Sequence, residues 1–149
     1  MTKEQFIHEM DRQVKLVRTE YSLTQETMAR ALGLSKKTLV EIEKGRSSLG
    51  WMGAVAFVSI FSNSQILSRL LGGEAEDMVL ALAFDDLKPT YPKTMGGKVG
   101  WRYVESVGPY RIQQNLISQH YRALDPEDGR VYSSFDLANV KAYLEQLPD

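Results

Sequence analysis

The stretch from Leu23 to Arg46 constrains the fold more than any other part of this chain, because it predicts two short helices around a tight turn. Thr24 and Ser35 lie eleven residues apart, and the hydroxyl of each can cap a helix by accepting from a backbone N–H two or three residues later. Gly33 falls at the end of the first helix, where a residue without Cβ adopts a left-handed conformation freely. The two caps leave room for little besides these helices.

The apolar residues of this stretch recur at helical spacing. Met28, Ala29 and Leu32 fall on one face of the first helix, and Leu39 and Ile42 fall on one face of the second. The two faces are therefore expected to pack against each other.

These residues resemble the lambda-repressor/Cro-like (XRE) family of DNA-binding domains. In that family Thr-Gln opens the second helix and Gly-Leu-Ser leads into the recognition helix, as Thr24-Gln25 and Gly33-Leu34-Ser35 do here. The segment Ile42-Glu43-Lys44-Gly45 has the form in which the recognition helix of the family ends. The resemblance covers about residues 3–63, and it implies an all-α five-helix domain with an Arg18–Glu43 salt bridge between its first and third helices.

The second helix of the pair is the candidate for insertion into DNA, since the major groove admits an α-helix whose exposed N-terminal residues meet the bases. The resemblance implies base contacts by Lys36, Lys37 and Glu41, although either lysine could instead hold only a phosphate. It also implies phosphate contacts near the helix ends. The full candidate set is Thr24, Gln25, Ser35, Lys36, Lys37, Val40, Glu41, Lys44 and Arg46.

Net charge alone does not indicate a nucleic-acid-binding protein, because the formal charge of the 149 residues is −1. The distribution is more informative: residues 1–63 carry nine Lys or Arg against seven Asp or Glu. Five of those nine cations fall between Arg30 and Arg46. Taken without the surrounding motif, they would be read as an ordinary solvated helix face.

Composition argues against several other classes of protein: disulfide-bonded proteins, metalloproteins, enzymes and membrane proteins. The chain has no cysteine, and His8 and His120 are too far apart to suggest a metal site, so neither a disulfide nor a metal or other cofactor is expected. Asp85, Asp86 and His120 are the only conceivable acid–base group, which argues against an enzyme. Without a long apolar run or a signal peptide, we expect a cytoplasmic protein with no membrane partner.

Helices are predicted on both sides of the central stretch. An amphipathic helix should span Thr2–Tyr21, and a mostly buried one should span Leu49–Ser62, including Met52. Two shorter helices at 66–71 and 75–84 complete a helical domain of residues 1–86. A linker rich in proline, glycine and lysine follows at 87–100.

The period of the pattern changes from about 3.6 to about 2 after this linker. Two hairpins, turning at Gly108-Pro109 and at 125–129, predict a four-stranded antiparallel sheet, and a helix at 137–147 should pack on it. Residues 101–149 thus form a small α+β unit, and the chain as a whole mixes an all-α domain with this α+β domain. The polar residues along its strands are read as those of any half-exposed sheet.

The sequence therefore predicts a sequence-specific regulator that binds double-stranded DNA. Since one such motif makes few base contacts, we expect a repressor acting as a homodimer on a palindromic operator, with residues 101–149 dimerising or sensing a small-molecule or protein effector. The alternative is an antitoxin-like interaction protein whose C-terminal unit binds another protein while the helix-turn-helix regulates its own operon.

Overall fold

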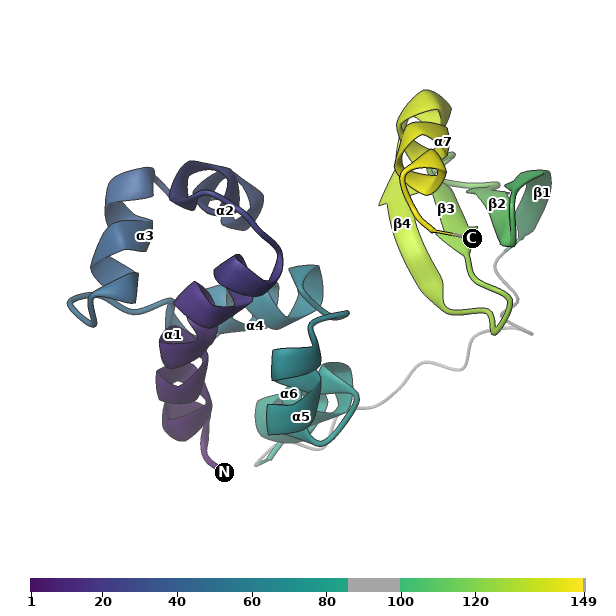
Figure 1. The fold of residues 1–149 in the computed structure, drawn as a ribbon. Helices are drawn as coiled ribbons and strands as arrows, with labels where there is room; N and C mark the ends of the chain where they lie inside the picture. Colours follow the sequence, from purple (N-terminus) through teal and green to yellow (C-terminus); the bar gives the residue numbers. More distant parts are fainter. Residues whose placement is uncertain (86–99, 149) are drawn as a thin grey trace. The chain divides into compact units, whose positions relative to one another are not determined.

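The computed structural model describes residues 1–85 and 100–148, and the chain divides into two compact units, Met1–Tyr91 and Pro92–Asp149. Each unit is described by itself (Figure 1). The predicted linker at 87–100 lies outside the described residues except for Gly100.

The first unit is entirely helical, as the sequence predicts. Thr2 caps its first helix through a reciprocal pair of hydrogen bonds with Gln5, and Ser64 caps its fifth by accepting from the Leu67 N–H. The helices are α1 (Lys3–Glu20), α2 (Gln25–Leu32), α3 (Lys36–Glu43), α4 (Gly50–Ile60), α5 (Gln65–Leu71) and α6 (Ala75–Ala83).

One hydrophobic core joins all six helices. Phe6, Met10, Val14 and Val17 follow one face of α1 and are fully buried, and they share one core with buried side chains from every other helix of the unit. Helices α5 and α6 contribute three of these: Leu67, Leu71 and Leu82. The last two helices are therefore part of the same folded body as the helix-turn-helix.

The prediction that α4 is mostly buried is wrong at two positions. Ala54, Phe57 and Val58 are buried, but Met52 is 85% exposed and Ile60 is 46% exposed. An eleven-residue helix that packs through one side leaves its other side to solvent, and a uniformly apolar sequence does not tell which side that is. Trp51 packs edge-on against Phe6, with ring centroids 5.8 Å apart, which is a core-filling contact.

Carboxylates on α1 hold the starts of two other helices. The Leu49 backbone N–H donates to Asp11 Oδ1 at 2.8 Å, where α4 begins without a side-chain cap of its own. The Gln65 N–H and the Ser64 hydroxyl both donate to the Glu20 carboxylate at the start of α5. Negative charge at a helix N-terminus is favourable, so α1 stabilises both of these helix starts.

The second unit is a four-stranded antiparallel sheet in the order β1-β2-β3-β4, covered on one side by a helix. Both predicted hairpins are present, and they place consecutive strands side by side. The elements are β1 (Trp101–Val107), β2 (Tyr110–Asn115), β3 (Tyr121–Leu124), β4 (Arg130–Ser134) and α7 (Leu137–Glu145). Together with the helical unit, this confirms the predicted fold class.

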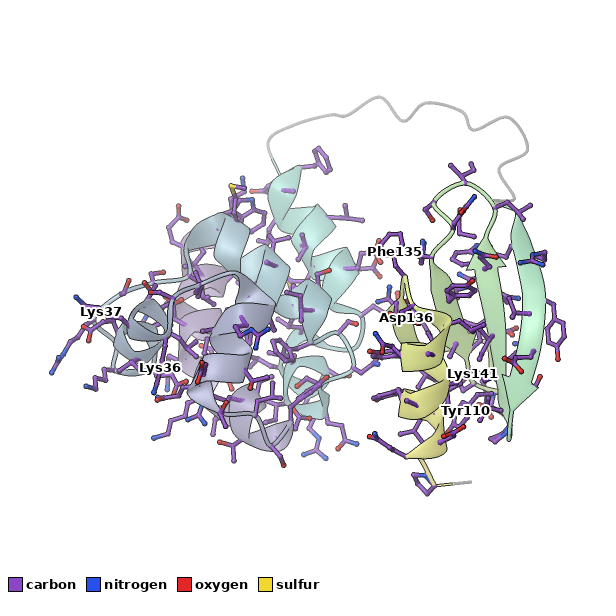
Figure 2. All side chains as sticks on the ribbon, turned by 90° about the horizontal axis from the view of Figure 1, so that it is seen from above. Lys36, Lys37, Tyr110, Phe135, Asp136 and Lys141 are labelled. Atoms are coloured by element: carbon purple, nitrogen blue, oxygen red, sulfur yellow. The ribbon has the colours of Figure 1, made fainter. Side chains whose placement is uncertain are left out.

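The core of the second unit lies between α7 and one face of the sheet. Ile112 and Ala123 from the sheet meet Val140 and Leu144 from α7, and all four are at most 2% exposed. Figure 2 shows Tyr110 and Lys141 on this side of the sheet. Lys141 Nζ lies 2.8 Å from Glu105 Oε1, which raises the pKa of Lys141 by a hydrogen bond and by the nearby charge.

Among the described residues no single helix is long and apolar enough to cross a membrane. Only α4 and α5 taken together reach that length and hydropathy, and they are bent by 119° at the break between them.

Candidate nucleic-acid interface

The two helices of the motif begin with the same hydrogen-bond arrangement. Thr24 Oγ1 accepts from the Thr27 N–H at 3.1 Å, and its hydroxyl lies 2.9 Å from Thr27 Oγ1. Ser35 and Thr38 repeat both contacts at the same distances. The predicted caps are thus present, and each uses the third amide of its helix, so the first two amides keep no partner within the helix.

The turn between the helices has the sharpness that the sequence predicts. Gly33 adopts a φ of +73°, and the Leu34 N–H donates to the Ala29 carbonyl at 2.8 Å. The end of α3 is closed in the same way, with Gly45 at +76° and the Arg46 N–H donating to the Glu41 carbonyl at 2.9 Å. Both ends of α3 are therefore fixed by local hydrogen bonds.

An ion pair sets the angle of α3 against the rest of the unit. The Arg18 guanidinium donates to both oxygens of Glu43, at 2.9 and 3.0 Å, and also to the Leu23 carbonyl at 3.2 Å. The Arg18 side chain is 18% exposed and that of Glu43 only 5%. The salt bridge that the resemblance implied is thus confirmed, and it joins α1, the start of the motif and the end of α3.

The exposed side of α3 carries the predicted base-contacting lysines. Leu39 and Ile42 are buried at 0% and 2% exposure, which turns Lys36 and Lys37 to solvent. Figure 2 shows Lys37 extending away from the body of the unit. Val40 is half-buried, so it offers an apolar surface beside the lysines.

Glu41, a predicted base-contacting residue, lies near Arg46, which was predicted to contact a phosphate. Its Oε1 is 3.9 Å from Arg46 Nη1, while about a third of the Glu41 side chain remains accessible. Lys44 and Arg46 are both exposed just beyond α3. The Glu41 carboxylate is thus partly balanced by Arg46, one of the predicted phosphate-binding side chains.

Gln25 is the predicted site residue whose side chain turns inward. Its Nε2 lies 3.4 Å from Glu43 Oε1, and the residue is half-buried, so it takes part in the Arg18 network as well as opening α2. Sequence reasoning also missed Thr27 and Thr38, whose hydroxyls are beside the caps. The repeated spacing of a capping hydroxyl and a threonine three residues later was the available signal.

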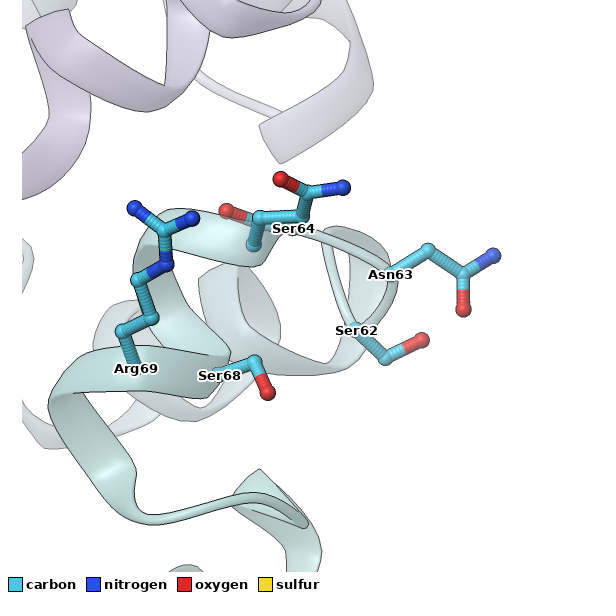
Figure 3. A pocket seen from close by; sticks show the side chains of 6 residues that line it. Ser62, Asn63, Ser64, Ser68 and Arg69 are labelled. Carbon is cyan, nitrogen blue, oxygen red and sulfur yellow. The ribbon is translucent and has the colours of Figure 1, made fainter.

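A shallow polar depression lies around the start of α5, outside the motif. Figure 3 shows the serines, amides and arginine that line it: Ser62, Asn63, Ser64, Gln65, Ser68 and Arg69. At this helix start the Glu20 carboxylate already accepts from the Gln65 N–H and from the Ser64 hydroxyl. Within residues 1–85 and 100–148, no group of three or more His, Cys, Asp or Glu side chains could hold a metal ion.

Comparison with known proteins gives one match. Residues 14–50 match the helix-turn-helix family model. The matched range takes in the C-terminal part of α1, both helices of the motif and the connection to α4. No curated protein and no solved structure matches the chain. The match coincides with the region where the XRE resemblance was found and does not reach the α+β unit.

Proposed function

We propose, from a DNA-binding helix-turn-helix in residues 14–50, that this chain is a sequence-specific transcriptional regulator and that residues 1–86 form its DNA-binding domain. The main support for the proposal is the geometry of α3. This helix is capped at its start, and Leu39 and Ile42 hold its inner face in the core. Its outer face presents two exposed lysines that form no ion pair in the described residues. A recognition helix needs a rigid inner face and an accessible outer one.

Within this proposal, the residues divide by the part of DNA that they can reach. Lys36 and Lys37 donate to guanine O6 or N7, and Glu41 accepts from a cytosine amino group. The first amides of α2, beside Thr24 and Gln25, bind a phosphate at the helix N-terminus. Ser35 caps α3, and Lys44 and Arg46 bind phosphates beyond its end.

We infer that two copies bind together as a repressor, since the α+β unit carries exposed apolar side chains next to each other. Leu116 is 58% exposed and Ile117 is 86% exposed, in the connection between β2 and β3. Neighbouring apolar residues of this exposure favour a protein contact. A two-fold pair on DNA would read half-sites about 34–36 Å apart, as a palindromic operator presents them.

The test is selection of an operator from random duplexes by the full chain, followed by titration of that operator. Lys36→Ala and Lys37→Ala should each lose affinity for the selected site while keeping the unfolding midpoint of the parent. Lys15→Ala removes an exposed lysine from α1, outside helices α2 and α3, and serves as the matched control. Selection that enriches no sequence would contradict the proposal.

The same apolar loop supports a second candidate function, an antitoxin-like protein whose α+β unit binds another protein. In that case Leu116 and Ile117 would contact the partner, and the helix-turn-helix would regulate the operon encoding both. Co-expression with the adjacent reading frame distinguishes the two: a stable hetero-complex that Ile117→Ser disrupts favours the second function.

A further inference from the structure

The face of the sheet opposite α7 is left open within residues 100–148, and it is built from arginine, aromatic and amide side chains. In the strand register, Tyr103 lies opposite Gln113, and Gln113 lies opposite Arg122, which lies opposite Ser133. These residues alternate with the buried Ile112 and Ala123, so they point away from α7. We call the open face the surface formed by Trp101, Tyr103, Arg111, Gln113, Arg122 and Ser133.

Arg122 occupies the centre of the open face in a fixed orientation. Its Nε and Nη2 both donate to Gln113 Oε1, at 3.0 and 2.9 Å, and its guanidinium lies 3.6 Å from the centroid of the Trp101 ring. These contacts hold the guanidinium without neutralising it, because none of its partners is a carboxylate. The remaining N–H groups of Arg122 keep their capacity to donate.

Further cations lie around Arg122. Burial and then the nearby Arg130 lower the pKa of Arg122, and Asp128 offsets this only in part. Arg111 lies on the same face and is paired with Asp128. Arg122 therefore carries its charge beside a second cation, Arg130, and an added anion gains energy at such a position.

Aromatic rings continue the open face toward the end where β1 begins. The edge of His120 meets Trp101 at 5.2 Å between centroids, and Phe135 lies 5.8 Å from His120. Phe135 is 76% exposed and Tyr103 is 59% exposed. Exposed aromatic rings such as these are able to stack with the bases of a nucleic acid.

We propose that the open face, together with the adjoining Arg130 and Phe135, binds single-stranded nucleic acid, with phosphates on Arg122 and Arg130 and bases stacked on Tyr103 and Phe135. Proteins that bind single strands combine a positive track with aromatic rings in this way. A second copy of the chain is a poor occupant, because a two-fold contact through this face would bring the same arginines together. An acidic protein would match the charge but would leave the rings without a flat partner.

This inference does not depend on the helix-turn-helix, and the experiment separates the two. The full chain is titrated with a fluorescent oligothymidylate of about 15 nucleotides and with a duplex, at two salt concentrations. Phe135→Ala and Arg130→Gln should each weaken binding of the single strand about fivefold or more. Both side chains are exposed, so neither change should impair folding.

Two controls are matched to these changes. Lys141→Gln removes one positive charge from α7, on the opposite side of the sheet, and Met52→Ala shortens an exposed apolar side chain of the helical unit. Both should leave single-strand binding unchanged, and Lys37→Ala should weaken duplex binding alone. Absence of oligothymidylate binding, equal losses in the controls, or a loss caused only by Lys37→Ala would overturn the proposal. So would a fall in dimer stability on Phe135→Ala with no change in oligothymidylate affinity.

Discussion

Arg18 and Glu43 face each other through two parallel hydrogen bonds, so that a residue near the end of α1 holds the last residue of α3. Arginine fits a carboxylate in this paired geometry as lysine cannot. The pair fixes the position of α3. Because Glu43 is almost completely buried, removing either partner should cost stability.

Arg18→Ala should lower the free energy of unfolding by about 3–5 kcal/mol, because it leaves a nearly buried carboxylate without its partner. Arg12→Ala is the matched control on the same helix, since Arg12 is 66% exposed and lies 4.0 Å from Glu9. That change should cost less than about 1 kcal/mol. Urea unfolding of the three proteins measures the difference, and equal midpoints would show that the buried pair does not stabilise the unit.

Alanine at an exposed position of α3 should preserve the unfolding midpoint; the variants are Lys36→Ala, Lys37→Ala and Glu41→Ala. If the replaced residue contacts a base, affinity for the selected operator should fall by about 1–3 kcal/mol. A lysine that holds only a phosphate should instead lower the slope of log affinity against log salt by about one. Glu41→Ala also frees Arg46, so its salt slope is the one to compare with the parent. Full affinity and preference in all three variants would exclude α3 as the recognition helix.

Ser22→Gly should stabilise the helical unit by about 0.5–1 kcal/mol, because relief of left-handed strain of about 1–2 kcal/mol exceeds the entropic cost of glycine. Ser22 follows α1 with a φ of +56°, a conformation that glycine adopts without the strain imposed by a Cβ. Its exposed position leaves no packing to lose. Thermal unfolding of Ser22→Gly beside Ser22→Ala tests this, and a lower midpoint for the glycine variant would contradict it.

Ile117→Ser should weaken self-association and binding to a two-half operator, while leaving the unfolding midpoint unchanged, since the side chain is 86% exposed. Met52→Ser alters a comparably exposed residue of the helical unit and should leave the dimer intact. Sedimentation and titration with half-site and full-site duplexes measure both effects. A monomeric parent protein on DNA would exclude the dimer, and dissociation by Met52→Ser alone would move the contact to α4.

Much of the fold could be predicted from the sequence because its signals are local. The caps at Thr24 and Ser35, the glycine at 33 and the turn residues of both hairpins specify backbone geometry within a few positions. The period of apolar residues likewise fixed which side of α1 is buried. These elements end within one or two residues of the predicted limits.

What the sequence could not show depends on contacts between distant residues. Met52 lies in an apolar run, and only the packing of α4 decides that it faces solvent. The contact of Gln25 with Glu43 and the capping of α4 by Asp11 join residues far apart in the chain. The contact of Arg122 with the Trp101 ring could not be predicted either, because alternation along one strand does not show which side chains of neighbouring strands meet.

The attachment of three helix ends to α1 has a consequence for how the helical unit opens. Asp11 holds the start of α4, Arg18 the end of α3, and Glu20 the start of α5. A fluctuation that frays α1 releases all three at once, so the amides of α3 should exchange with solvent deuterium at the rate set by α1 rather than by their own short helix. The proposed recognition helix, α3, would then be as rigid as α1, which is the longest helix within residues 1–85 and 100–148.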